Sequence, residues 1–123
     1  MRKRISVLLA ACLTAALSVS AHAQEAAKEA PKEPTGKDIA FDRSKGNCLA
    51  CHAMPGVAGA ESPGTIGPPL VAMKARFPDR AKLRAQIWDA TAMNPRSSMP
   101  PFGKHKVLTE QEVDKVTDFI HGL

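Results

Sequence analysis

The sequence contains no tyrosine, a single tryptophan and four phenylalanines. It also lacks stretches in which apolar and polar residues alternate, and glycine and proline interrupt its middle part. These absences exclude the usual pattern of β-strands, so we expect an all-α fold. Aromatic and basic residues are not interleaved either, which argues against a nucleic-acid partner.

Long apolar runs are missing as well, and none reaches the roughly 20 residues that a membrane-spanning helix requires. An uncharged stretch, residues 5–18, follows three basic residues and precedes the small residues of Ala21-His22-Ala23. This order is typical of a secretory signal peptide. We therefore expect residues 1–23 to be removed on export, and the mature protein to lie in the periplasm without a membrane span.

Cysteine is scarce, with three residues in the chain. Cys12 falls within the expected signal peptide and would be discarded with it. Alternatively, residues 9–12 form a lipoprotein cleavage box, in which case Cys12 would carry a lipid. The two remaining cysteines are too few for a framework of several disulfides.

The mature part divides into a leader and one small domain. Residues 24–36 are mostly Ala, Glu, Lys and Pro, a composition that favours a flexible leader. Residues 37–123 form the expected domain. A domain of this size buries little core and usually needs an additional stabilising element.

Three segments of the domain are predicted to be helical: residues 38–47, 79–92 and 109–123. Asp79 is a plausible N-cap of the second, and Thr109 with Glu112 forms a capping box at the start of the third. The connections between these helices are long. Long loops are unusual in a compact domain unless they surround something.

The central motif is Cys48-Leu49-Ala50-Cys51-His52. Two cysteines three positions apart can reach the two vinyl groups of a porphyrin, and the histidine that follows can place its imidazole on the iron. C-x-x-C-H is therefore interpreted as an attachment site for one covalent haem c. Three readings remain as alternatives: a thioredoxin-like redox pair, which would need strands; a zinc site, which would need more ligands; and a simple Cys48–Cys51 disulfide.

The second axial ligand of the iron must come from elsewhere in the chain. The candidates are Met54, Met73, Met93, Met99, His105 and His121. We favour Met99, with His105 second, because two prolines after Met99 stiffen its loop and lower the entropy lost when the thioether is held on iron.

Two further residues are candidates for contacts around the cofactor. The carbonyl of Pro68, in the Gly67-Pro68-Pro69-Leu70 turn, is proposed to accept a hydrogen bond from His52. Trp88 could donate its indole N–H to a haem propionate, and core packing is an alternative of at least equal weight. A basic cluster around residues 74–84 is either a solvated face or a docking patch for an acidic partner.

These features together resemble class I cytochromes c, with three to four helices wrapped around one haem. The segments GNCLACHAMPG, GTIGPPLVAMKARFPDRAKLRAQIWDATAMNP and MPPFGKHKVLTEQEVDKVTDFI resemble the SoxX subunit of the sulfur-oxidising SoxAX cytochrome. The resemblance implies thioethers at Cys48 and Cys51, iron ligation by His52 and Met99, and a SoxA-type partner. It also implies that catalysis, as an L-cysteine S-thiosulfotransferase acting on thiosulfate, belongs to that partner, and that this chain passes electrons to a downstream cytochrome.

Overall fold

The computed structural model describes residues 32–123, which contain helices and turns and no strand, as expected for an all-α fold. The elements, in chain order, are α1 (Gly36–Phe41), the 3-10 turn η1 (Cys48–Ala50), α2 (Met73–Arg76), α3 (Arg80–Trp88), α4 (Ala90–Met93) and α5 (Glu110–His121). No helix in this part of the chain is long and apolar enough to cross a membrane. The predicted signal peptide, the alternative role of Cys12 and most of the predicted leader lie outside the described residues.

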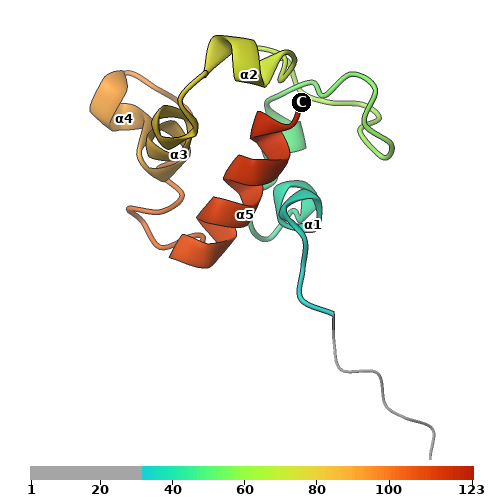
Figure 1. Ribbon diagram of the computed structural model, residues 1–123, viewed down its shortest axis with the longest axis horizontal. Coiled ribbons are helices and arrows are strands. Elements are labelled where there is room, and N and C mark those ends of the chain that lie inside the picture. Colours follow the sequence, from blue (N-terminus) through green and yellow to red (C-terminus); the bar gives the residue numbers. More distant parts are fainter. Residues whose placement is uncertain (1–31) are drawn as a thin grey trace, which may run out of the picture. The chain divides into compact units, whose positions relative to one another are not determined.

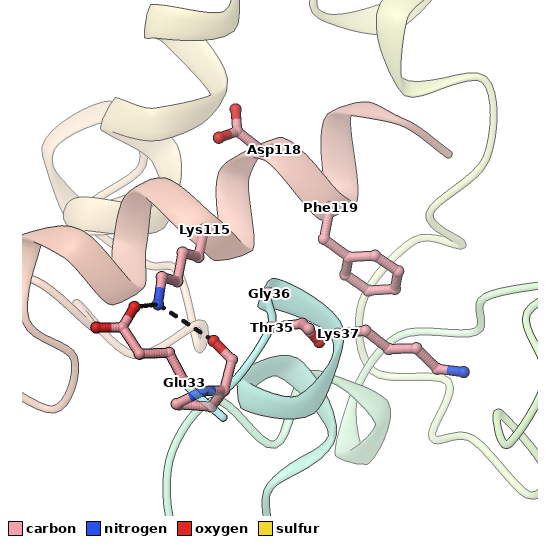
Figure 2. A pocket seen from close by; sticks show the side chains of 8 residues that line it. Glu33, Thr35, Gly36, Lys37, Lys115, Asp118 and Phe119 are labelled. Atoms are coloured by element: carbon pink, nitrogen blue, oxygen red, sulfur yellow. Dashed lines mark hydrogen bonds and ion pairs between the residues drawn. The ribbon is translucent and has the colours of Figure 1, made fainter. Parts of the chain in front are cut away.

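The first and last helices lie side by side (Figure 1). Gly36 is the point of closest approach, because a Cβ atom there would lie 2.0 Å from the carbonyl oxygen of Lys115 and 2.9 Å from the Cβ of Phe119. The rings of Phe41 and Phe119 pack edge to face with centroids 6.2 Å apart. Lys115 also donates to Glu33 at 2.7 Å, on the opposite side of the contact from Phe119 (Figure 2).

Capping explains where these two helices begin. Thr109 and Glu112 form the predicted capping box of α5, and Thr35 with Asp38 forms a second one at α1. Each box satisfies N–H groups that have no partner inside the helix. Because of its cap, α1 begins at Gly36, one residue before the predicted start of the domain.

The first helix is shorter than the predicted helix over residues 38–47. It ends at Phe41, because the carboxylate of Asp42 accepts from the backbone N–H of Ser44 at 2.7 Å and turns the chain. Gly46 then packs on the end of α1, where its N–H donates to the carbonyl of Ile39 at 3.2 Å. Local side-chain bonds of this kind compete with helix propagation.

The second predicted helix, residues 79–92, is interrupted. Asp79 is its N-cap as expected, accepting from Ala81 N at 2.8 Å. Asp89, with φ −151°, breaks the helix and caps α4 through Thr91 N. The connection before α3 contains a short helix, α2, that the hydrophobic periodicity did not indicate. The residue before this helix, Ala72, adopts the left-handed conformation.

The core lies between α5 and the other helices. Its fully buried members include Ile39, Met54, Met73, Val113 and Val116. Surface ion pairs join α3 to α5, since Arg84 Nε donates to Asp114 at 2.7 Å and Arg80 pairs with Asp114 and Asp118. Two arginines of the basic cluster around residues 74–84 are therefore used within the fold.

Candidate functional site

The C-x-x-C-H motif forms one tight turn. Asn47 precedes it in the left-handed conformation, and Cys48 accepts at its carbonyl from the N–H of Cys51 and of His52, at 3.2 and 2.9 Å. Both thiols are free and partly exposed. Burial raises the pKa of the Cys48 thiol to about 11. The turn thus presents both sulfurs and the imidazole from five consecutive residues.

A second segment, residues 64–70, runs along the motif. Backbone bonds of 2.8 Å join Gly64 N to Leu49 O, Gly67 N to Cys51 O and Leu70 N to Ala53 O. Gly64 permits this approach, since a Cβ atom there would lie 1.9 Å from the carbonyl oxygen of Ala50. The result is that the Gly-Pro-Pro-Leu turn lies directly against His52.

This turn fixes the histidine. His52 Nδ1 lies 2.6 Å from the carbonyl oxygen of Pro68, the acceptor expected from the sequence. Because a carbonyl oxygen can only accept, Nδ1 carries the proton and Nε2 keeps its lone pair for a metal. Gly67 closes over the ring, where a Cβ atom would lie 2.3 Å from Cε1. Arg76 Nη1 donates to Pro69 O at 2.7 Å and holds the neighbouring peptide.

The motif opens onto a cavity of about 760 Å³. Cys48, Cys51, His52 and Pro68 line it, and so does Met99 from the loop between α4 and α5. Seven further apolar lining side chains come from the connection and from helices α2, α3 and α5: Leu70, Met73, Phe77, Leu83, Ile87, Val116 and Ile120. The turn and Met99, which lie 47 positions apart by residue number (99 − 52), therefore share one hydrophobic chamber.

Only two of the six candidate axial ligands line this cavity, Met99 and Met73. Met73 is 1% exposed, packs in the core as its type predicts, and its sulfur accepts from Arg76 Nη1 at 3.4 Å. Met93 is exposed, and His121 Nε2 donates to the carbonyl oxygen of Phe77 at 2.9 Å. The geometry leaves Met99 as the partly buried thioether at the cavity.

A family model described as "Cytochrome C oxidase, cbb3-type, subunit III" matches residues 36–120. The chain belongs to this family of cytochrome c domains. The crystal structure of SoxXA from P. pantotrophus is similar to it, with a TM-score of 0.63 and 27% identity over 70% of this chain and 77% of that one. The fold and sequence thus support a SoxX-like class I cytochrome c that transfers electrons.

A second similar protein matches this chain over only part of its own length. An uncharacterized lipoprotein of Aquifex aeolicus (strain VF5) is 32% identical over 77 residues, which cover 63% of this chain. The match spans only 36% of the lipoprotein's own length. The matched segment thus covers about a third of that relative, whose role as a whole does not transfer.

The cavity suits the haem c that the family carries. Its volume lies within the range of about 300–1,000 Å³ typical of ligand sites, its lining is mostly apolar, and two free thiols border it beside a histidine with a fixed tautomer. Three arginines, Arg43, Arg76 and Arg96, also line it. Guanidinium groups are suited to carboxylates, so these residues are the better candidates for the two propionates.

The structure does not bring Trp88 to this site. Trp88 does not line the cavity, and its ring instead packs against Gly103, with the guanidinium of Arg84 5.5 Å from its centroid. Gly67, Arg76, Arg43 and Arg96 also belong to the site, although the sequence did not mark them as site residues. The Gly-Pro-Pro-Leu turn was a signal for the first, whereas nothing local marks the arginines as cavity residues.

The non-haem alternatives find no support in residues 32–123. No three His, Cys, Asp or Glu side chains gather there as a metal site would need, and Cys48 and Cys51 are not bonded to each other. A second hollow, between Glu33, Gly36 and Phe119, lies on the outside of the α1–α5 contact (Figure 2). It contains none of the expected site residues.

Proposed function

We propose that this cytochrome is the small monohaem electron-transfer subunit of a SoxAX-type complex in the periplasm. Thioethers from Cys48 and Cys51 hold the haem, and His52 and Met99 are the axial ligands. The observation that carries this proposal is the one cavity that the C-x-x-C-H turn and Met99 share. The likeness to SoxXA supports the choice of complex.

In this proposal the ligands of the haem iron decide which step this chain performs and which step its SoxA-type partner performs. Bound haem supplies an iron that gains or loses one electron. If His52 and Met99 both ligated the bound iron, no position would be open for a substrate, and the coupling of thiosulfate to a carrier-protein cysteine would belong to the SoxA-type partner. This chain accepts the released electrons and passes them to another cytochrome.

The chain's own residues set the conditions for that transfer. The carbonyl oxygen of Pro68 accepts from Nδ1 of His52, which fixes the ring orientation and directs Nε2 to the cavity side as the metal-binding nitrogen. The apolar lining from α3 and α5 excludes water, and Leu83 and Ile87 are at most 5% exposed. A thioether ligand favours ferrous iron, so ligation by Met99 raises the reduction potential.

Two measurements test the proposal in order. Protein matured in a host that assembles c-type cytochromes should carry the mass of one haem and stain for haem on a denaturing gel. The native protein should then copurify from the periplasm with a larger SoxA-type cytochrome. Isolation as a monomer with no affinity for such a protein would contradict the assignment to this complex.

A second candidate is a general periplasmic electron shuttle that serves a terminal oxidase. The matching family model, described by an oxidase subunit, favours it. Reduced protein would then be oxidised by membranes containing that oxidase, without any SoxA-type partner. The two candidates share the haem site and differ only in which partner the protein binds.

The axial ligand has its own test. Met99→Ala should keep the haem attached, open the iron to carbon monoxide in the ferrous state and lower the potential. Rapid carbon monoxide binding by the unaltered protein would instead indicate an open-site haem enzyme or gas sensor.

A further inference from the structure

The loop that follows Met99 returns to the corner between α3 and α4. The carbonyl oxygen of Trp88 accepts from the backbone N–H groups of both Gly103 and Lys104, each at 3.2 Å. Gly103 lies on the indole ring so closely that a Cβ atom would be 2.0 Å from Cε3. The preceding Phe102 is buried. The chain is therefore in close contact with the corner three to five residues after Met99.

Asp89, at that corner, completes the contact. Asp89 is only 8% exposed, and its carboxylate accepts a hydrogen bond from Lys104 Nζ at 2.7 Å. The same carboxylate caps α4 by accepting from Thr91 N at 3.0 Å and from the Thr91 hydroxyl. The carboxylate is largely buried while the Lys104 side chain is 56% exposed, so the pair ties the loop to the corner from its solvent side through a charge-assisted hydrogen bond.

The segment before Met99 is held to the same corner. Asn94 N donates to the carbonyl of Ala90 at the end of α4, and Ser97 N donates to Asn94 O at 2.8 Å. The side chain of Ser97 then accepts from Met99 N at 3.2 Å. Met99 thus lies between two segments that both contact the α3–α4 corner. Asp89 separates α3 from α4 at this corner, and it also binds Lys104 from the segment after Met99.

We propose that Asp89 is a positioning residue for Met99. The ion pair between Asp89 and Lys104 keeps the loop closed on the haem, so that the thioether of Met99 stays on the iron. The inference rests on the proposed ligation of iron by Met99. A loop attached at both ends loses little entropy when its thioether binds, whereas a loop held there only by the backbone bonds to Trp88 O opens more often and must be ordered again. Asp89 touches neither iron nor haem in this role.

The test is Asp89→Asn in the holoprotein. The carboxamide keeps the size of the side chain and an oxygen for the α4 cap, but it removes the charge that holds Lys104. The readout is the far-red charge-transfer band of thioether-ligated ferric haem, followed through a denaturant titration together with far-ultraviolet circular dichroism. Carbon monoxide association with the ferrous protein is measured without denaturant.

We expect the band of the variant to disappear well before its helices unfold, and carbon monoxide to bind about tenfold faster than in the wild type, in keeping with the loss of one charge-assisted hydrogen bond. Lys104→Met should behave in the same way, whereas Lys104→Arg, which keeps the positive charge, should retain the band as the wild type does. Asp118→Asn is the matched control, because it removes a carboxylate paired with Arg80 on a different face. In that control the band and the helices should be lost together.

The outcomes separate the two claims. If Asp89→Asn and Lys104→Met keep the band until the helices unfold, and bind carbon monoxide at the wild-type rate, the positioning role is refuted while ligation by Met99 stands. Lys104→Met alone decides the matter if Asp89→Asn does not fold. If the wild-type protein has no such band, ligation by Met99 is itself wrong, and the role of Asp89 is overturned with it.

Discussion

Replacing Gly67 with alanine should disturb the haem histidine directly. The added Cβ would lie 2.3 Å from Cε1, 2.6 Å from Nδ1 and 2.7 Å from Nε2 of His52. Ordinary contacts are more than about 1 Å longer, so either the imidazole or the turn must move by about that distance. The bond from His52 Nδ1 to Pro68 O, now 2.6 Å, would then reach a separation at which no hydrogen bond exists.

The cost can be estimated from these two effects. Overpacking a close contact costs about 1–3 kcal/mol, and loss of the hydrogen bond adds about 1 kcal/mol. We therefore expect Gly67→Ala to lower the free energy of unfolding of the holoprotein by about 2–4 kcal/mol. The haem should stay attached, because the thioethers to Cys48 and Cys51 do not depend on the imidazole.

Denaturant unfolding of holoprotein measures this loss, and the absorption spectrum reports whether the iron keeps both axial ligands. Gly122→Ala is the matched control, since a Cβ there meets no atom closer than 3.3 Å and lies outside the cavity lining. A Gly67→Ala protein with wild-type stability and an unchanged spectrum would refute the claim that Gly67 cradles the ring.

Three other changes are informative. Gly36→Ala should cost about 1–3 kcal/mol, because its Cβ would lie 2.0 Å from the Lys115 carbonyl oxygen; denaturant unfolding measures it, and a stability equal to that of Gly122→Ala would contradict the helix contact. Asp114→Asn should cost about 1 kcal/mol, since its pairs with arginines of α3 lie at the surface and are only partly buried, and the difference from wild type should shrink at 1 M salt. Hydrogen bonds from Lys104 and Thr91 lower the pKa of Asp89 to about 2. This carboxylate therefore stabilises the fold fully above its unfolded pKa of about 3.9 and loses that effect as the pH falls toward 2. The stability difference between wild type and Asp89→Asn should close over the same interval, and a constant difference would contradict the ion pair.

The parts of the molecule that sequence predicted are those decided within a few residues. The C-x-x-C-H turn needs only five consecutive positions, and the capping box at Thr109 and Glu112 needs four. The acceptor role of Pro68 was also accessible, because a turn with two prolines has carbonyls and few N–H groups to satisfy them. In each case the interaction partners are close in sequence or limited by residue type.

The parts that sequence did not predict depend on contacts between distant segments. Helix propensity alone does not end α1 at Phe41, since the turn after it uses the Asp42 side chain and the packing of Gly46 on Ile39. Trp88 could reach a propionate or the core on chemical grounds, and only the approach of Gly103 selects the core. The residues next to a position in the sequence do not determine which distant segment will pack against it.

Three glycines show how this distant packing builds the site. Gly64, Gly67 and Gly103 each occupy a place where a Cβ would lie 2.3 Å or less from the motif backbone, the His52 ring or the Trp88 ring. The first two bring the Pro68 carbonyl to the histidine, and the third brings the loop of Met99 to the α3–α4 corner. Each long connection is thereby fastened to a helix or turn on one side of the cavity, and the residues proposed as axial ligands are held by the chain itself. An iron whose ligands do not have to move between oxidation states can exchange electrons with little reorganisation of the surrounding protein, and the loops that looked too long for a domain of this size are what hold those ligands still.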